Sequence, residues 1–218
     1  MSRAGEAHLS QISWEGRDRE DQRNRELLNA DLRAKRLVFE SRPYEAHVQF
    51  SNFCNMSCVM CHNGKNPPLQ KMSPALLRRL RDEVCPTLTF VTPHDGSEPT
   101  VVTWDETVSL AKDCSVRLWL TTNGQVFDER KFHECKDALD LLTVSVDSHV
   151  PEVFEAIRPG AKAEQVYANL ETVARLSREL GPRQHVAQQR AAGARERTHH
   201  IGDVWRWRAL KFVTKFVV

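Results

Sequence analysis

The chain has 218 residues, of which 40% are hydrophobic and 28% are charged. This length is enough to bury a core and excludes a disulfide-stapled mini-protein, and the composition fits neither a disordered chain nor a membrane protein. No apolar run reaches the roughly 20 residues of a spanning helix, and the first 25 residues lack the apolar stretch of a secretory signal. We therefore expect a cytoplasmic protein with reduced thiols and no membrane partner.

The formal net charge of +2 is divided unevenly along the chain. Residues 1–181 carry 23 Lys+Arg and 27 Asp+Glu, whereas residues 182–218 carry 8 and 2. A basic tail can contact nucleic acid, but a small excess of charge is more often a solvated surface. We therefore do not expect a nucleic-acid partner.

Short apolar runs alternate with amphipathic stretches along most of the chain. After a polar segment at 1–19, apolar residues at helical spacing predict a helix over 20–39. Strands that alternate with helices of about ten residues or more form a parallel sheet, so we expect an α/β fold with four strand–helix units. The predicted strands are 46–50, 87–92, 116–121 and 141–146, and the predicted helices are 73–84, 103–112, 128–138 and 150–180, the last interrupted at Pro159-Gly160.

The alternation stops shortly after Gly181-Pro182. The next strand is expected there, but residues 183–197 are too polar for a buried parallel strand, and only Leu210–Val218 regains strand-like composition. We therefore expect three segments: an N-terminal polar segment and helix at 1–43, a core at 44–181, and a basic tail of unclear structure at 182–218.

The strongest chemical signal is a CxxxCxxC motif formed by Cys54, Cys58 and Cys61, directly after the first predicted strand. Three thiolates within eight residues can wrap one soft metal centre, and cysteines hold iron–sulfur clusters. With only three local ligands, a 4Fe-4S cluster keeps one iron open for a small molecule. The alternative is a structural zinc module that takes a distant fourth ligand. Three further cysteines, at 85, 114 and 135, lack metal spacing and are expected to be structural thiols.

Four segments follow the successive predicted strands in an order typical of one family. The CxxxCxxC motif follows the first strand, His94–Pro99 the second and Thr121–Gly124 the third, while Ser145–Asp147 ends the fourth, with Phe154–Gly160 downstream. With these motifs the sequence resembles the radical S-adenosylmethionine superfamily over about residues 44–181. The resemblance implies a partial (β/α) barrel, here with four recognisable units of an expected six. It also implies a 4Fe-4S cluster on the three cysteines, with S-adenosylmethionine bound at the open iron.

The resemblance further implies how the motifs contact S-adenosylmethionine. Met60 takes the place of an aromatic residue that packs near the adenine, and a polarizable thioether can fill that role. Gly96 and Ser97 are expected to let the backbone approach the methionyl group, with Glu98 near its ammonium.

Residues after the third and fourth strands complete the expected cofactor site. Asn123, Ser145 and Asp147 are expected to be polar partners for the ribose or the carboxylate. Arg158 is expected to grip the carboxylate with two N–H groups.

The implied function is reductive cleavage of S-adenosylmethionine to a 5′-deoxyadenosyl radical, with an electron donor such as flavodoxin or ferredoxin. The substrate is unknown, and modification of a peptide or protein is one option. A different hypothesis is a truncated or disrupted family member that binds a cluster at most. It is motivated by the loss of the strand–helix pattern near Pro182, where the charge balance also changes sign.

Overall fold

The computed structural model describes residues 14–62, 68–94, 96–180 and 211–214. In this part of the chain a five-stranded sheet runs in sequential order, β1-β2-β3-β4-β5, and every neighbouring pair is parallel. The predicted α/β fold is therefore confirmed. The strands are β1 (Glu45–His47), β2 (Phe90–Thr92), β3 (Arg117–Thr122), β4 (Leu139–Val144) and β5 (Lys211–Thr214).

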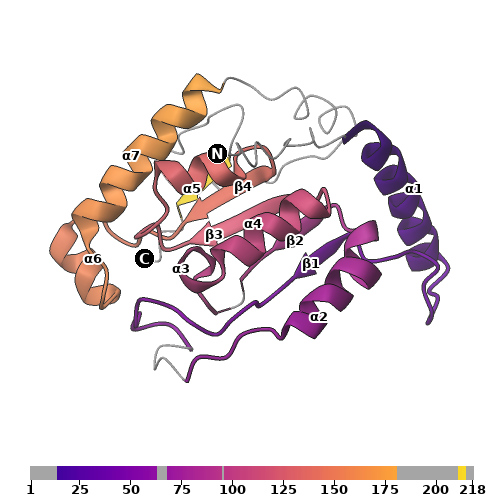
Figure 1. Ribbon diagram of the computed structural model, residues 1–218, viewed down its shortest axis with the longest axis horizontal. Helices are drawn as coiled ribbons and strands as arrows, with labels where there is room; N and C mark the ends of the chain where they lie inside the picture. Colours follow the sequence, from indigo (N-terminus) through magenta and orange to yellow (C-terminus); the bar gives the residue numbers. More distant parts are fainter. Residues whose placement is uncertain (1–13, 63–67, 95, 181–210, 215–218) are drawn as a thin grey trace, which may run out of the picture.

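Helices connect the first four strands and follow the fourth, which confirms the four predicted strand–helix units. Figure 1 shows α2, α4 and α5 lying across the same face of the sheet. No helix in the described ranges is both long and apolar enough to cross a membrane. The helices are α1 (Trp14–Arg33), α2 (Pro74–Arg79), α3 (Pro99–Val102), α4 (Trp104–Asp113), α5 (Glu129–Cys135), α6 (Pro151–Ile157) and α7 (Ala163–Glu179), with a π-helical turn at Leu80–Val84 and a 3-10 turn at Cys85–Thr87.

The sheet buries one set of alternating side chains beneath its helices. On β3, Leu118 and Leu120 are fully buried, whereas Arg117 and Trp119 on the opposite face are only partly buried. This period of two follows from the pleat of a strand. The core is built mainly from these apolar strand residues together with apolar residues of the helices, among them Leu110, Phe132, Phe154, Val166 and Val173.

Helix caps agree with the sequence better than helix lengths do. The Ser73 hydroxyl accepts a hydrogen bond from the Leu76 amide, and Pro74 occupies the first turn of α2, as a capped helix start predicts. In contrast, α1 ends at Arg33 and not at residue 39. The chain turns there through Lys35, whose φ is +51°, because buried Asp31 accepts a hydrogen bond from the Ser41 amide and folds the following segment back.

Strand β4 and the basic tail also differ from what the sequence pattern predicts. Strand β4 begins and ends two residues earlier than predicted, so the Ser145 side chain lies just beyond the end of the strand. Residues 211–214 form β5 and pair with β4 from Leu141 to Val144, which places the strand-like end of the tail beside the fourth strand. The polar segment 183–197 lies outside the described residues.

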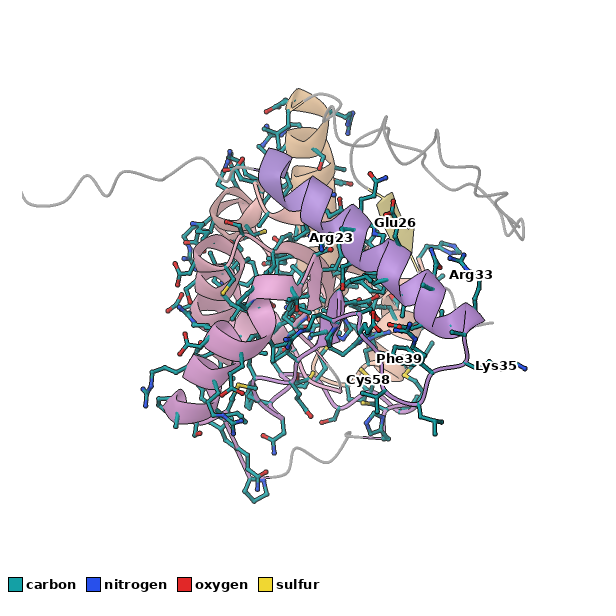
Figure 2. All side chains as sticks on the ribbon, turned by 90° about the vertical axis from the view of Figure 1, so that its right-hand side faces the viewer. Arg23, Glu26, Arg33, Lys35, Phe39 and Cys58 are labelled. Atoms are coloured by element: carbon teal, nitrogen blue, oxygen red, sulfur yellow. The ribbon has the colours of Figure 1, made fainter. Side chains whose placement is uncertain are left out.

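Because all strands are parallel, their carboxyl ends meet at one edge of the sheet. The segment with the CxxxCxxC motif leaves β1 at this edge, and α6 follows β4 there. Helix α1 lies at the opposite end of the strands, as Figure 1 shows. Figure 2 looks from the α1 side, where Arg23, Glu26 and Arg33 lie on the helix and Lys35 points away from the body of the molecule.

Candidate functional site

The three motif cysteines lie on a loop, residues 54–61, that we call the cysteine loop. Its base is closed on both sides: the Met72 amide donates to the Phe50 carbonyl at 2.7 Å, and Ser51 pairs with Lys71 in an antiparallel bridge. Inside the loop, Met56 is only 3% exposed and packs in the core. The loop is therefore held at its base and at its middle, while the cysteines remain nearer the surface, with Cys54 and Cys58 partly buried and Cys61 exposed.

A second contact docks the cysteine loop on the segment 157–160, which we call the α6 turn. Pro159 disfavours the helical conformation for the residue before it, so α6 ends at Ile157 and its last carbonyls lack partners within the helix. Two amides of the cysteine loop donate to carbonyls at this end and just after it: Val59 to Ile157 at 3.0 Å and Ser57 to Pro159 at 2.8 Å. The end of α6 is thus satisfied by the backbone of the loop.

Gly160 lets the two segments approach closely. Its φ is +96°, a conformation that side chains with a Cβ rarely adopt. A Cβ added at this position would lie 2.9 Å from the Asn55 carbonyl oxygen and 3.4 Å from the Met56 Cα. Glycine is therefore required here both by the backbone angle and by the closeness of the cysteine loop.

Arg158 links the α6 turn to the second cysteine. Its Nε and Nη2 groups donate to the two carboxylate oxygens of Asp147, the latter at 3.2 Å, and its Nη1 group donates to Cys58 Sγ at 3.5 Å. The Asp147 side chain is 1% exposed and the Arg158 side chain 13%, so the ion pair is largely shielded from water. Asp147 and Arg158, two of the residues predicted to hold S-adenosylmethionine, thus form an ion pair with each other in the structure.

Asn123 links the end of β3 to the first cysteine. Its Nδ2 group donates to Asn55 Oδ1 at 2.7 Å and lies 4.0 Å from Cys54 Sγ, while its Oδ1 accepts from the Gln125 amide at 3.0 Å. The side chain is thereby fixed against the cysteine loop.

Glu98 is buried and joins the segment after β2 to the end of β3. One carboxylate oxygen accepts from the Thr100 amide, the Thr100 hydroxyl and the Thr122 hydroxyl, and the other accepts from the Asn123 amide at 2.7 Å. Its own amide donates to the Phe53 carbonyl, next to the cysteine loop. Burial raises the pKa of Glu98, and the four hydrogen bonds oppose this by stabilising the charged form.

The remaining predicted site residues lie in the segments around this framework. Gly96 has a φ of +73° and forms the turn between β2 and α3, where Ser97 is partly buried. The Ser145 amide donates to the Thr122 carbonyl at 2.9 Å and extends the pairing of β3 with β4. Met60 is 50% exposed, in keeping with a place on the open side of the cysteine loop.

The donor set of the cysteine loop fits an iron–sulfur cluster. Burial raises the pKa of the Cys54 and Cys58 thiols, and at Cys58 the Arg158 charge opposes this rise. In the described residues, no three His, Cys, Asp or Glu side chains are gathered closely enough to hold one metal ion. A cubane cluster does not need such a group, because each thiolate binds a different iron. Three thiols are the donor type that such a cluster takes, and the zinc hypothesis lacks a gathered ligand set in this part of the chain.

The sequence profile of the Radical SAM superfamily matches residues 48–180, which is more than half of the chain. The chain therefore belongs to the radical S-adenosylmethionine superfamily. The match begins within the segment after β1 and ends with α7, so it spans the cysteine loop and all four motifs.

Two solved structures of SuiB share the fold. Streptococcus suis SuiB bound to S-adenosylmethionine is 17% identical over 78% of this chain and 41% of its own, with a TM-score of 0.52. SuiB bound to its precursor peptide SuiA is 17% identical over 77% and 39%, with a TM-score of 0.50. Native anSMEcpe with bound AdoMet is 19% identical over 61% and 41%, with a TM-score of 0.48. The chain thus spans about two fifths of the length of these proteins. A comparison with curated proteins found no match.

Sequence reasoning missed the residues that support the cysteine loop. Asn55 lies inside the motif but looks like a spacer, and Pro159-Gly160 reads only as an interruption between two helices. Thr100 and Thr122 have ordinary sequence surroundings, although their hydroxyls satisfy Glu98. Apart from Thr100, their roles depend on contacts between segments far apart in the sequence, such as Thr122 with Glu98 and Ser57 with Pro159.

Proposed function

We propose that this chain binds a 4Fe-4S cluster through Cys54, Cys58 and Cys61 and binds S-adenosylmethionine at the open iron. When bound, the cluster supplies the electron that cleaves S-adenosylmethionine reductively to a 5′-deoxyadenosyl radical. The observation that carries the proposal is the docking of the cysteine loop against Asn123, directly after β3, and against Arg158 and the α6 turn. Active sites of parallel strand–helix folds form at this edge, where separate segments converge.

The residues of this chain have distinct roles in the proposal. Asn123, Arg158 and the α6 turn orient the cysteine loop, and Glu98 ties the ends of β2 and β3 beneath it. Gly96 and Ser97, which are partly buried, and Ser145 are proposed to receive the methionyl and ribose groups, and Met60 the adenine. An electron donor such as flavodoxin or ferredoxin would approach at the exposed side of the loop, near Cys61.

A peptide or protein is the substrate class we propose for the complete protein. SuiB, which shares the fold, was solved with a precursor peptide bound. The match covers 39% of SuiB in that complex. The proposal therefore concerns the substrate class alone and assigns no substrate contacts to residues of this chain.

The direct test is anaerobic reconstitution of the full chain with iron and sulfide, followed by S-adenosylmethionine, a reductant and an assay for 5′-deoxyadenosine. We expect product from the parent chain, none from Cys58→Ala, and parental yield from the matched variant Cys114→Ala, whose cysteine lies at the end of α4. Equal product from Cys58→Ala and the parent would contradict the proposal.

The same experiment separates the two other hypotheses. A disrupted family member would take up the cluster and yield no 5′-deoxyadenosine. A zinc module would retain zinc with the three cysteines and take up no iron–sulfur cluster. The coding DNA downstream of the codon for Pro182 provides a further check: a family-like strand–helix continuation in another frame would favour disruption.

A further inference from the structure

In the part of the chain that the structure describes, a cationic side chain contacts Cys58 and neither of the other two motif cysteines. Among the described residues, Arg158 is the one cationic side chain that donates a hydrogen bond to a sulfur of the cysteine loop. Cys54 meets the neutral amide of Asn123 at 4.0 Å, a longer and weaker contact. The three thiols are therefore in different electrostatic surroundings.

The position of the Arg158 guanidinium is fixed from two directions. Asp147 accepts from two of its nitrogens in the fork arrangement that favours arginine over lysine, and this contact directs Nη1 to the sulfur. The backbone of Arg158 is held in turn, because its amide donates to the Phe154 carbonyl at 2.9 Å and Phe154 is fully buried. The contact with Cys58 is thus built into the fold and does not depend on a mobile side chain.

A fixed N–H donor and positive charge at a ligating sulfur affect the energy of the bound centre. Reduction adds an electron to a cluster, and hydrogen bonds to its sulfurs stabilise the more negative state. The effect is strengthened by burial, because charges interact more strongly when water is excluded. The groups that support a metal ligand commonly tune the metal in this way.

We propose that Arg158, fixed by Asp147, is a positioning residue that holds the Cys58 sulfur and raises the reduction potential of the cluster. This proposal rests on the cluster of the proposed function. It differs from the role implied by the family resemblance, in which Arg158 grips the carboxylate of S-adenosylmethionine. Three of the five N–H groups of the guanidinium are used by Asp147 and Cys58.

The test is the midpoint potential of the reconstituted cluster, measured by spectroelectrochemistry without S-adenosylmethionine. In Arg158→Met we expect the equilibrium constant for reduction of the cluster to fall by about tenfold. This equals a midpoint potential lower by about 59 mV for one electron. Arg158→Lys keeps the charge but cannot contact both Asp147 oxygens and Cys58, so we expect a smaller shift of the same sign. The control is Arg81→Met, which breaks an ion pair between the π-helical turn and the end of α4, where Asp113 lies. This variant should leave the potential unchanged.

Two results would overturn the proposal. One is a parental potential in both Arg158 variants at parental iron content. The other is a parental potential combined with weakened binding of S-adenosylmethionine, which would assign Arg158 to the cofactor alone.

Hydrogen exchange in the iron-free chain covers the case in which no cluster assembles. We expect the Ser57 and Val59 amides, which donate to the α6 turn, to lose protection in Arg158→Met and to keep it in Arg81→Met. If the parent chain takes up no cluster, the proposed function and the predicted effect on potential both fail, while the exchange result still decides whether Arg158 positions the loop. Unchanged protection in Arg158→Met would then overturn the positioning role as well.

Discussion

The two ends of the parallel sheet are organised differently. At the carboxyl ends of the strands, Glu98, Asn123 and Asp147 are 3%, 6% and 8% exposed, and each has several hydrogen-bond partners. At the opposite end, Leu37 and Val38 are 100% and 83% exposed although they are apolar. Buried polar groups are costly unless they are satisfied, and the carboxyl ends gather three of them, whereas the segment after α1 is held through one, Asp31.

The segments at the two ends are also held differently. The cysteine loop is bound at its base, by the α6 turn and by Asn123, whereas the segment after α1 is held mainly through Asp31 and an Asn24 contact with Arg42. Substitutions at the first end should therefore change both stability and cluster binding. Substitutions at the second end should leave cluster binding intact.

Glu98→Gln is expected to have the largest effect on stability. A glutamine amide places its own N–H group against one of the N–H or O–H groups that now donate to the carboxylate. One buried donor is then left without an acceptor. We expect a loss of about 1–3 kcal/mol in the free energy of unfolding, measured by urea denaturation of the full chain. A parental midpoint would mean that the Glu98 network does not join β2 and β3.

Gly160→Ala is expected to act locally on the cysteine loop. A residue with a Cβ in this backbone region costs of order 1–3 kcal/mol, and here the Cβ also meets the Asn55 carbonyl. We expect faster hydrogen exchange at Ser57 and Val59 and a lower yield of cluster. The control is Leu37→Ser, a fully exposed position after α1, and equal exchange in both variants would contradict the close approach.

Asp31→Asn tests the opposite end through its pH dependence. The hydrogen bond from the Ser41 amide is the main cause that lowers the pKa of Asp31 below its usual range. The ionised carboxylate thus stabilises the fold above its unfolded pKa of about 3.9, and this contribution is lost as the pH falls through the lower folded value. Urea midpoints should differ between parent and variant at pH 7 and converge in acid, with equal cluster uptake. A difference that persists in acid would contradict this assignment.

Leu37→Ser should have the smallest effect. Its side chain is fully exposed, and surface substitutions of this kind usually change stability by less than about 0.5 kcal/mol. We expect parental unfolding and parental cluster content. A large loss in either would show that the segment after α1 supports the site.

Much of the fold and the place of the site were predictable from the sequence. Periodicity predicted the strand–helix units, and the parallel sheet that follows from them placed the four motifs at one edge. The length of α1 was not predictable, because it depends on a contact between Asp31 and Ser41. The pairing of β5 with β4 was not predictable either, since a long polar segment separates Lys211 from α7.

The partners within the site were harder to predict than its location. A motif identifies Glu98, Asp147 and Arg158 as functional but does not specify which atoms they meet. The inward direction of Glu98 depends on the hydroxyls of Thr100 and Thr122, which periodicity does not distinguish from other threonines. For that reason, their expected contacts with S-adenosylmethionine remain predictions.

The most direct test of the central claim is electron paramagnetic resonance of the reduced, reconstituted chain before and after addition of S-adenosylmethionine. We predict the signal of a reduced 4Fe-4S cluster that changes when the cofactor binds the open iron, and no such signal in Cys58→Ala. A cluster signal that S-adenosylmethionine leaves unchanged, or one that persists in Cys58→Ala, would contradict the account.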